Sequence, residues 1–162
     1  LAQLDGGQTS TRTIRLLDVG SGAGLPGVVI AACCPSLQIT CIDAVGKKAA
    51  FVRQVAAELG LPNLQALHGR VESLDKQAGA CRFEVITSRA FSSLPNLVTL
   101  TERVLAHDGF WLAMKGRVPA EEISALSPTV EVFHVEQLTV PTLDAERCIV
   151  WLRKKDPAPP GS

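Results

Sequence analysis

Net charge is absent from this sequence of 162 residues, because sixteen basic side chains balance sixteen acidic ones. A chain without a basic excess is not a general nucleic-acid coat protein, although one face of it can still be basic. Long apolar runs are absent as well. No stretch of 18 or more apolar residues occurs, which argues against a membrane-spanning helix, and residues 1–13 lack the charged and apolar regions of a signal peptide.

Cysteine pairs and metal-binding clusters are also missing. The five cysteines form no C-x-x-C pair, and the three histidines are scattered without a partner at ligand spacing. An odd number of cysteines, mostly in apolar segments, is typical of a reduced, intracellular protein. We therefore expect a cytoplasmic protein without a metal, in which Cys41 and Cys148 are buried thiols. Trp111 and Trp151 are likewise expected in the core. The sequence does not begin with methionine, so we expect a truncated or processed chain.

Strand-like and helix-like segments alternate along the chain, and 46% of the residues are hydrophobic, enough for the core of one domain. This alternation predicts a Rossmann-like, doubly wound α/β fold, with a mostly parallel seven-stranded sheet and helices on both faces. The domain is expected over 14–155, after a short N-terminal segment (1–13) and before a Pro-rich, disordered tail (156–162). Strands are predicted at 14–19, 37–42, 64–68, 83–87, 110–114, 130–140 and 147–152, the last two as an antiparallel pair. Helices are predicted at 26–35, 47–59, 92–106 and, shorter, from 72 and 119, and a turn at 108–109 is expected to lead into the fifth strand.

A glycine-rich loop closes the first predicted strand and opens the first helix, with the sequence DVGSGAG from Asp18 to Gly24. Glycines let the backbone turn tightly and let a ligand approach it, and the N–H groups of the following helix can meet a polar ligand. Asp43 ends the second strand, 19 residues after Gly24. A carboxylate there can accept hydrogen bonds from both ribose hydroxyls of an adenosine. Together these features predict a nucleoside-binding site.

Two ligands compete for this loop. Residues 22–27 match G-x-G-x-x-G, the dinucleotide fingerprint, which would indicate an NAD-dependent oxidoreductase. However, the carboxylate of Asp18 beside the loop would repel a pyrophosphate, whereas it suits the ammonium group of a methionine moiety. We therefore favour S-adenosylmethionine over NAD, and expect Asp18, Ser21, Gly22 and Gly24 to belong to its binding site.

Five segments in combination carry a resemblance to a known family: DVGSGAGLPG (18–27), GKK (46–48), GRVE (69–72), SRAF (88–91) and MKG (114–116). Over about 14–155 the chain resembles the bacterial guanine-N7 methyltransferases of small-subunit (16S) ribosomal RNA, the glucose-inhibited division protein B family. The resemblance implies a class I methyltransferase fold and S-adenosylmethionine as methyl donor. It also implies donor-site roles for Gly20 and Leu25 in the first loop, for Val71 and Glu72 beside the adenine, and for Arg89 near the acceptor base.

Basic residues follow the predicted strands at the edge where open α/β sheets bind their ligands. Such a rim can contact RNA phosphates, although solvated loop residues are the plainer interpretation. The residues expected to contact the RNA are Lys47, Lys48, Arg89, Lys115 and Arg117, with Arg70 on the same rim. The expected partner is small-subunit ribosomal RNA or the 30S particle, and we expect a monomer that does not bind membranes.

Transfer to guanine N7 makes few chemical demands, because N7 carries a lone pair and no proton. We therefore expect no catalytic acid–base residue, only alignment of the two substrates. Phe91 can stack on the base, but a core position is favoured for it. Two other acceptor classes stay open for the same fold, a small molecule or a protein, and so does a non-enzymatic RNA-binding module.

Overall fold

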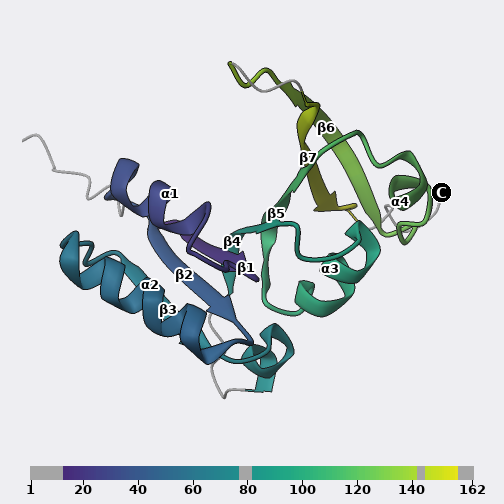
Figure 1. The fold of residues 1–162 in the computed structure, drawn as a ribbon. Coiled ribbons are helices and arrows are strands. Elements are labelled where there is room, and N and C mark those ends of the chain that lie inside the picture. The colour runs from purple at the N-terminus through teal and green to yellow at the C-terminus, as the bar shows by residue number, and fades with distance from the viewer. Residues whose placement is uncertain (1–12, 77–81, 142–144, 157–162) are drawn as a thin grey trace, which may run out of the picture.

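One sheet organises the computed structural model, which describes residues 13–76, 82–141 and 145–156. Within these ranges seven strands lie in the order β3-β2-β1-β4-β5-β7-β6 (Figure 1). The first five strands are parallel, and β7 runs antiparallel to both β5 and β6. The predicted sheet and its antiparallel final pair are confirmed. The strands are β1 (Arg15–Val19), β2 (Gln38–Asp43), β3 (Leu64–His68), β4 (Phe83–Arg89), β5 (Leu105–Lys115), β6 (Val130–Leu138) and β7 (Arg147–Lys154).

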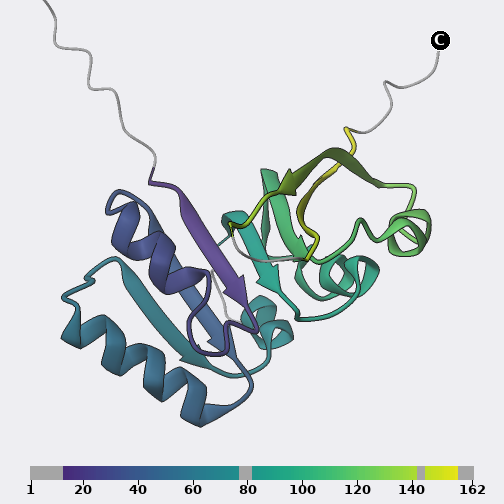
Figure 2. The same cartoon turned by 45° about the horizontal axis from the view of Figure 1, so that its top comes forward.

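Helices cover both faces of the sheet, as predicted. Alternate residues of β1 point to opposite faces, so Leu16 joins one buried cluster while Leu17 and Val19 join the other. The first cluster lies beneath α1 (Gly27–Cys33) and α2 (Gly46–Glu58), which lie side by side in Figures 1 and 2. The second cluster lies beneath the 3-10 helix η1 (Val71–Lys76), α3 (Leu94–Thr101) and α4 (Ala120–Ser124).

The predicted helix at 92–106 is too long, and the predicted turn at 108–109 is wrong. Helix α3 ends at Thr101, and β5 already begins at Leu105, which pairs with Phe83 of β4. Leu105 fits the apolar spacing of the predicted helix, but it is buried in the core as the first residue of a strand. The β4–β5 register shifts between the pairs Phe83–Leu105 and Val85–Phe110, which accommodates residues 106–109 as extra residues of β5. The strand therefore continues through the expected turn.

The predicted core residues are mostly where the sequence placed them. Trp111 is fully buried, and its indole N–H donates to the hydroxyl of Thr101 at 2.8 Å. Cys41 and Cys148 are buried, and the four cysteines in the described residues are free thiols. Trp151, also expected in the core, is only half-buried and stacks on Phe110 with ring centres 5.6 Å apart. Apart from Thr13 and Asp156, the expected N-terminal segment and tail lie outside the described residues.

The order of the strands creates a crevice between β1 and β4. The chain leaves β1 through α1 toward β2 and β3, and then returns through η1 to β4 on the other side of β1. Connections that depart in opposite directions leave space outside the carboxyl ends of the two central strands. Figure 2 shows the arrowheads of β1, β2 and β3 pointing the same way, toward that edge.

The side chain of Asn63 holds the amino end of this half of the domain together. Its amide group donates to the carbonyls of Ala31, Cys34 and Leu37 at 3.0, 3.3 and 3.1 Å. These carbonyls belong to the end of α1 and to the turn that leads into β2. Asn63 is buried, so without its amide group these carbonyls would lose a hydrogen-bond donor that water replaces poorly.

We therefore predict that Asn63→Ala lowers the free energy of unfolding by about 2–3 kcal/mol, because buried acceptors lose their donor. Asn63→Asp should cost more, since a carboxylate would face three carbonyl oxygens. Urea denaturation measures both variants. Asn96→Ala, at an exposed position, is the control and should stay within about 0.5 kcal/mol of wild type. Equal stabilities for all three variants would contradict this role of Asn63.

Candidate functional site

The loop after β1 folds back on itself directly beneath the ring of Phe91. Gly20 has a φ of +66°, and a Cβ there would come within 2.6 Å of Phe91 Cδ2. The N–H of Gly20 donates to the carbonyl of Ile42 at 2.9 Å, and the N–H of Gly24 donates to the carbonyl of Ser21 at 2.9 Å. Only glycine combines the left-handed backbone with this close approach, so the loop has little freedom to take other residues.

Asp18 lies behind the loop rather than in it. It is completely buried, and its Oδ2 accepts a hydrogen bond from the N–H of Gly27 at 2.9 Å. The thiol of Cys41 donates to the same oxygen at 3.9 Å, while Oδ1 is buried without a hydrogen-bond partner among the described residues. Burial raises the pKa of Asp18 to about 6, although the hydrogen bonds from Gly27 and Cys41 and the positive charge of Arg89 lower it. In this position the carboxylate fixes the start of α1.

Asp43 reaches the other side of the loop from the end of β2. Its Oδ2 accepts from the N–H of Gly22 at 2.9 Å, and its Oδ1 accepts from the N–H of Val45 at 2.8 Å. Each carboxylate oxygen still has capacity for a further hydrogen bond. The adjacent strands thus present a glycine loop and a carboxylate that is already oriented by the backbone.

A cavity of about 410 Å³ opens at this edge of the sheet, outside the carboxyl ends of β1 to β4. Four of the predicted donor-site residues line it: Gly20, Asp43, Val71 and Glu72. Arg70, expected on this rim, and Phe91, for which stacking on the base and a core position were both considered, also line the cavity. Sequence reasoning missed Asn96 and Leu100, because α3 comes close only in the folded chain and its sequence carries no motif. The other lining residues that were not predicted are Val19, Ile42, Ala44, Gly69 and Ser92.

The other predicted donor-site residues support this cavity without lining it. Ser21 is buried under the loop, and Gly22 holds Asp43 through its N–H. Gly24 packs against α1, where a Cβ would lie 2.4 Å from Val28 Cγ2. Leu25 is exposed, and its carbonyl accepts a hydrogen bond from Nε of Arg89 at 3.4 Å.

Another cavity, of about 650 Å³, lies at the opposite edge of the sheet. It is lined by residues such as Arg15, Thr40, Leu67 and Phe83, near the amino ends of the parallel strands. None of the described residues that line it is a glycine, and ligands of open α/β sheets bind at the carboxyl ends of the strands. We therefore take the smaller cavity as the functional one.

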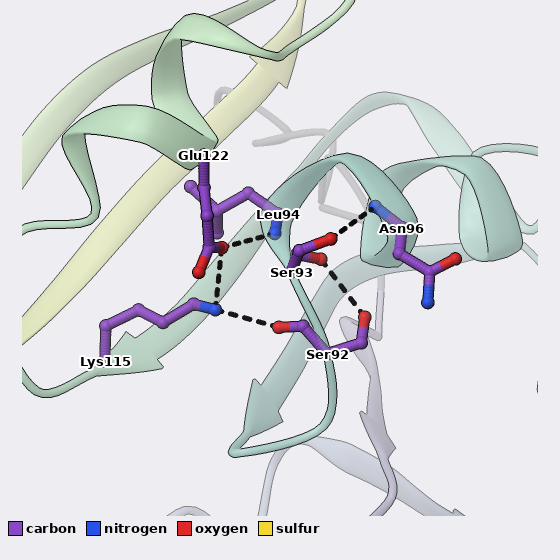
Figure 3. A network of polar contacts seen from close by, with 6 residues as sticks. All are labelled: Ser92, Ser93, Leu94, Asn96, Lys115 and Glu122. Carbon is purple, nitrogen blue, oxygen red and sulfur yellow. Dashed lines mark hydrogen bonds and ion pairs between the residues drawn. The ribbon is translucent and has the colours of Figure 1, made fainter.

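The segment that follows β4 is fixed by a polar network on the second half of the sheet (Figure 3). Lys115 donates to the carbonyl of Ser92 at 2.8 Å and to Oε2 of Glu122 at 2.9 Å. The same carboxylate oxygen accepts from the N–H of Leu94 at 2.7 Å, at the start of α3. Although burial would raise the pKa of Glu122, the hydrogen bonds from Lys115 and Leu94 lower it. The ammonium of Lys115, predicted to contact RNA, thus holds residues 92–94 in place.

The remaining basic residues predicted to contact RNA lie on the exposed rim. Lys47 and Lys48 stand in the first turn of α2, and Arg89 ends β4. Arg117 follows β5 and pairs with Glu146 at 3.7 Å. In the described ranges, no three His, Cys, Asp or Glu side chains gather as a metal site, and no helix is long and apolar enough to span a membrane.

Since the ionised form of Asp18 is disfavoured by burial, we predict that stability falls as pH rises from about 4 through 6. The pKa is near 3.8 when unfolded and about 6 when folded, so the native state binds more protons in this window. This loss of stability between pH 4 and 7 is on the order of 3 kcal/mol. Asp18→Asn should remove it, because an amide does not ionise.

The measurement is the free energy of unfolding of both proteins at several pH values. The ion pair of Arg15 and Glu84 stabilises the fold fully above about pH 4.5: burial would raise the pKa of Glu84, but the hydrogen bonds from Arg15 outweigh it and lower that pKa to about 2. That contribution is lost as pH falls below about 4.5, and both proteins share it. Parallel curves for the two proteins between pH 4 and 7 would refute the assignment to Asp18.

Solved structures of other proteins share this fold. TrmN from Thermus thermophilus superposes with a TM-score of 0.67 at 20% identity, over 88% of this chain and 44% of that one. A mutant of MtNAS, solved in complex with S-adenosylmethionine, superposes with a TM-score of 0.64 at 14% identity, over 88% of this chain and 55% of that one. At these identities the likeness establishes the fold, and it confirms the predicted class.

Sequence comparison gives closer relatives, all named ribosomal RNA small subunit methyltransferase G. Identity is 62% to the protein of Methylibium petroleiphilum, over 91% of this chain and 65% of the relative. It is 53% to that of Paracidovorax citrulli, over 100% and 65%. The chain thus spans slightly less than two thirds of these relatives. The family model described as rRNA small subunit methyltransferase G matches residues 3–150, which confirms the resemblance: the chain belongs to the GidB family.

Proposed function

We propose that the chain is the S-adenosylmethionine-binding domain of an enzyme that methylates N7 of a guanine in small-subunit ribosomal RNA. The observation that carries the proposal is the cavity of about 410 Å³, in which Gly20 and Asp43 from neighbouring strands meet Val71 and Glu72. Its volume lies in the usual range for small-molecule sites, about 300–1,000 Å³. The family membership and the relatives' names support the choice of reaction.

The residues present fit the donor. Asp43 is held by two backbone N–H groups, so its free lone pairs are oriented toward hydroxyls of a ribose in the cavity. Val71 and Glu72 supply an apolar side chain and an acceptor for an adenine. S-adenosylmethionine brings a methyl group on a sulfonium, which leaves as a neutral thioether once the methyl is transferred.

The protein's part in the reaction is alignment. With the donor bound, the residues around the cavity would only have to hold guanine N7 in line with the methyl group, because N7 carries a free lone pair and no proton. No general base is therefore required of the protein. Arg89, at the end of β4, is connected to the glycine loop through its hydrogen bond to the carbonyl of Leu25, and we expect it to lie near the acceptor base.

The exposed lysines of α2 suit an RNA acceptor. Lys47 and Lys48 are exposed in the first turn of α2, which begins at Gly46, and Ala44 just before this helix lines the cavity. Cationic side chains that neutralise phosphates release counterions, which makes such binding dependent on salt. We expect the enzyme to act in the cytoplasm as a monomer, on 16S ribosomal RNA or the 30S particle.

Gly20→Ala should reduce the affinity for S-adenosylmethionine at least tenfold, because the new methyl group pushes Phe91 toward the cavity. Gly60→Ala is a matched control, since Gly60 has a similar φ of +62° but nothing within 4 Å of its Cβ position. Both variants should lose about 1 kcal/mol of stability from the left-handed backbone. Calorimetric titration with S-adenosylmethionine and with NAD measures the affinities. Binding of NAD alone would overturn the proposal.

Replacing Lys47 and Lys48 together by alanine should weaken binding of 16S ribosomal RNA and flatten its dependence on salt. If each lysine contacts one phosphate, the slope of log K against log salt should fall by about 1.4–1.8. Arg103→Ala removes an exposed charge near the amino ends of the strands and should leave the slope unchanged. An unchanged slope in the double variant would show that these lysines are only solvated.

A further inference from the structure

A second cavity, of about 490 Å³, lies on the other side of the segment that follows β4. Its walls come from the ends of β4 and β5 and from the loop end of the β6–β7 hairpin, where β6 ends and β7 begins. The residues used below are Arg89, Ala90, Met114, Leu138, Val140 and Arg147. The family resemblance pointed to none of the hairpin residues, and Arg147 was not among the predicted site residues.

Residues 89–92 separate this cavity from the one assigned to the donor. Arg89 and Ala90 line the second cavity, whereas Phe91 and Ser92 line the first. Ala90 has a φ of +53°, a left-handed conformation that few residues other than glycine adopt. Strained residues of this kind gather at functional sites, where the surrounding structure holds them. Here the network of Lys115 and Glu122 anchors the segment immediately beyond Ala90.

The second cavity combines an apolar wall with a cationic rim. Met114 is half-buried, and Leu138 and Val140 remain exposed. Arg147 is also exposed, and its guanidinium lies over Gly116, with Nη1 4.0 Å from the position of a Cβ there.

The charge of the rim is positive. The cavity lining contains Arg89, Arg147 and Lys115, of which Lys115 is paired with Glu122, and no carboxylate among the described residues. The neighbouring Glu146 pairs with Arg117 at 3.7 Å, so its charge is partly neutralised. A flat, apolar ring that carries an anionic group is the ligand that this combination fits.

We propose that the second cavity receives the target purine nucleotide, with the base against Met114 and Leu138 and a phosphate against Arg147. This inference rests on the proposed function, because it names the acceptor side of that same site. It assigns Arg147 as a nucleotide-binding residue of the β6–β7 hairpin. It also makes residues 89–92 a border shared by the two sites, beside which N7 and the methyl carbon would have to meet directly.

Met114 allows a direct test, since it is the only methionine of the sequence. Labelling with [methyl-¹³C]methionine therefore gives one resonance from the wall of this cavity. The labelled 162-residue chain is titrated with guanosine 5′-monophosphate in the presence of excess S-adenosylhomocysteine, and then with guanosine. We expect the Met114 signal to move with both probes, and the nucleotide to bind more tightly because it carries the phosphate.

Arg147→Ala should weaken binding of the nucleotide about fivefold or more and leave guanosine unaffected. Arg153→Ala is the matched control. Arg153 lies on the same strand and face about 20 Å away, where it pairs with Glu131 at 2.7 Å. This control should bind both probes like wild type. A Met114 signal that does not respond to the nucleotide, or equal effects of the two variants, would overturn the inference.

The two proposals fail in different ways. If S-adenosylhomocysteine binds but the Met114 signal ignores the nucleotide, the donor site stands and the second cavity is not the acceptor site. If the Met114 signal moves but S-adenosylhomocysteine does not bind, the proposed function falls and the nucleotide site remains. Methyl transfer to a protein acceptor, with no response to the nucleotide, would overturn the nucleotide assignment.

Discussion

The close approach of α1 to strands β1 and β2 is the constraint on which the rest of the site depends. A Cβ at Gly27 would lie 2.4 Å from Cys41 Sγ and 2.9 Å from Asp18 Oδ2, so a side chain there would force the helix away. The hydrogen bond from the N–H of Gly27 to the buried carboxylate of Asp18 ties the helix to the sheet. Burial penalises the charge of Asp18, so the contact is kept at a cost to stability. The path of the glycine loop toward Asp43 follows from this packing.

A second set of contacts fixes the other wall of the site. The carboxylate of Glu122 reaches from α4 to the first N–H of α3 and to the ammonium of Lys115 at the end of β5. Three elements that are separated in sequence are thereby joined around the turn after β4 (Figure 3). Because this turn lies between two cavities, its rigidity controls the geometry of both. A partly buried, hydrogen-bonded ion pair suits this purpose, since removing one partner would leave the charge of the other uncompensated.

Much of the fold followed from patterns within short segments. The alternation of strand-like and helix-like segments predicted a doubly wound sheet, and the observed strand order agrees. The error at 92–106 has a clear cause. Leu97, Val98 and Leu105 fit a helical period, but the pairing of Leu105 with Phe83 is a contact between strands that no local pattern reports. Tertiary pairing therefore decided where α3 ends.

The sequence alone was sufficient for the glycine loop, for Asp43 at its distance from that loop, and for the family to which the chain belongs. These features depend on local backbone geometry and on the edge where parallel strands end. Only the tertiary structure showed that Asp18 is buried behind the loop, that Lys115 is held in an ion pair, and that Arg147 lines the same cavity as Arg89. The physical reason is that burial and charge pairing are set by neighbours distant in sequence, whose approach depends on the packing of the whole sheet.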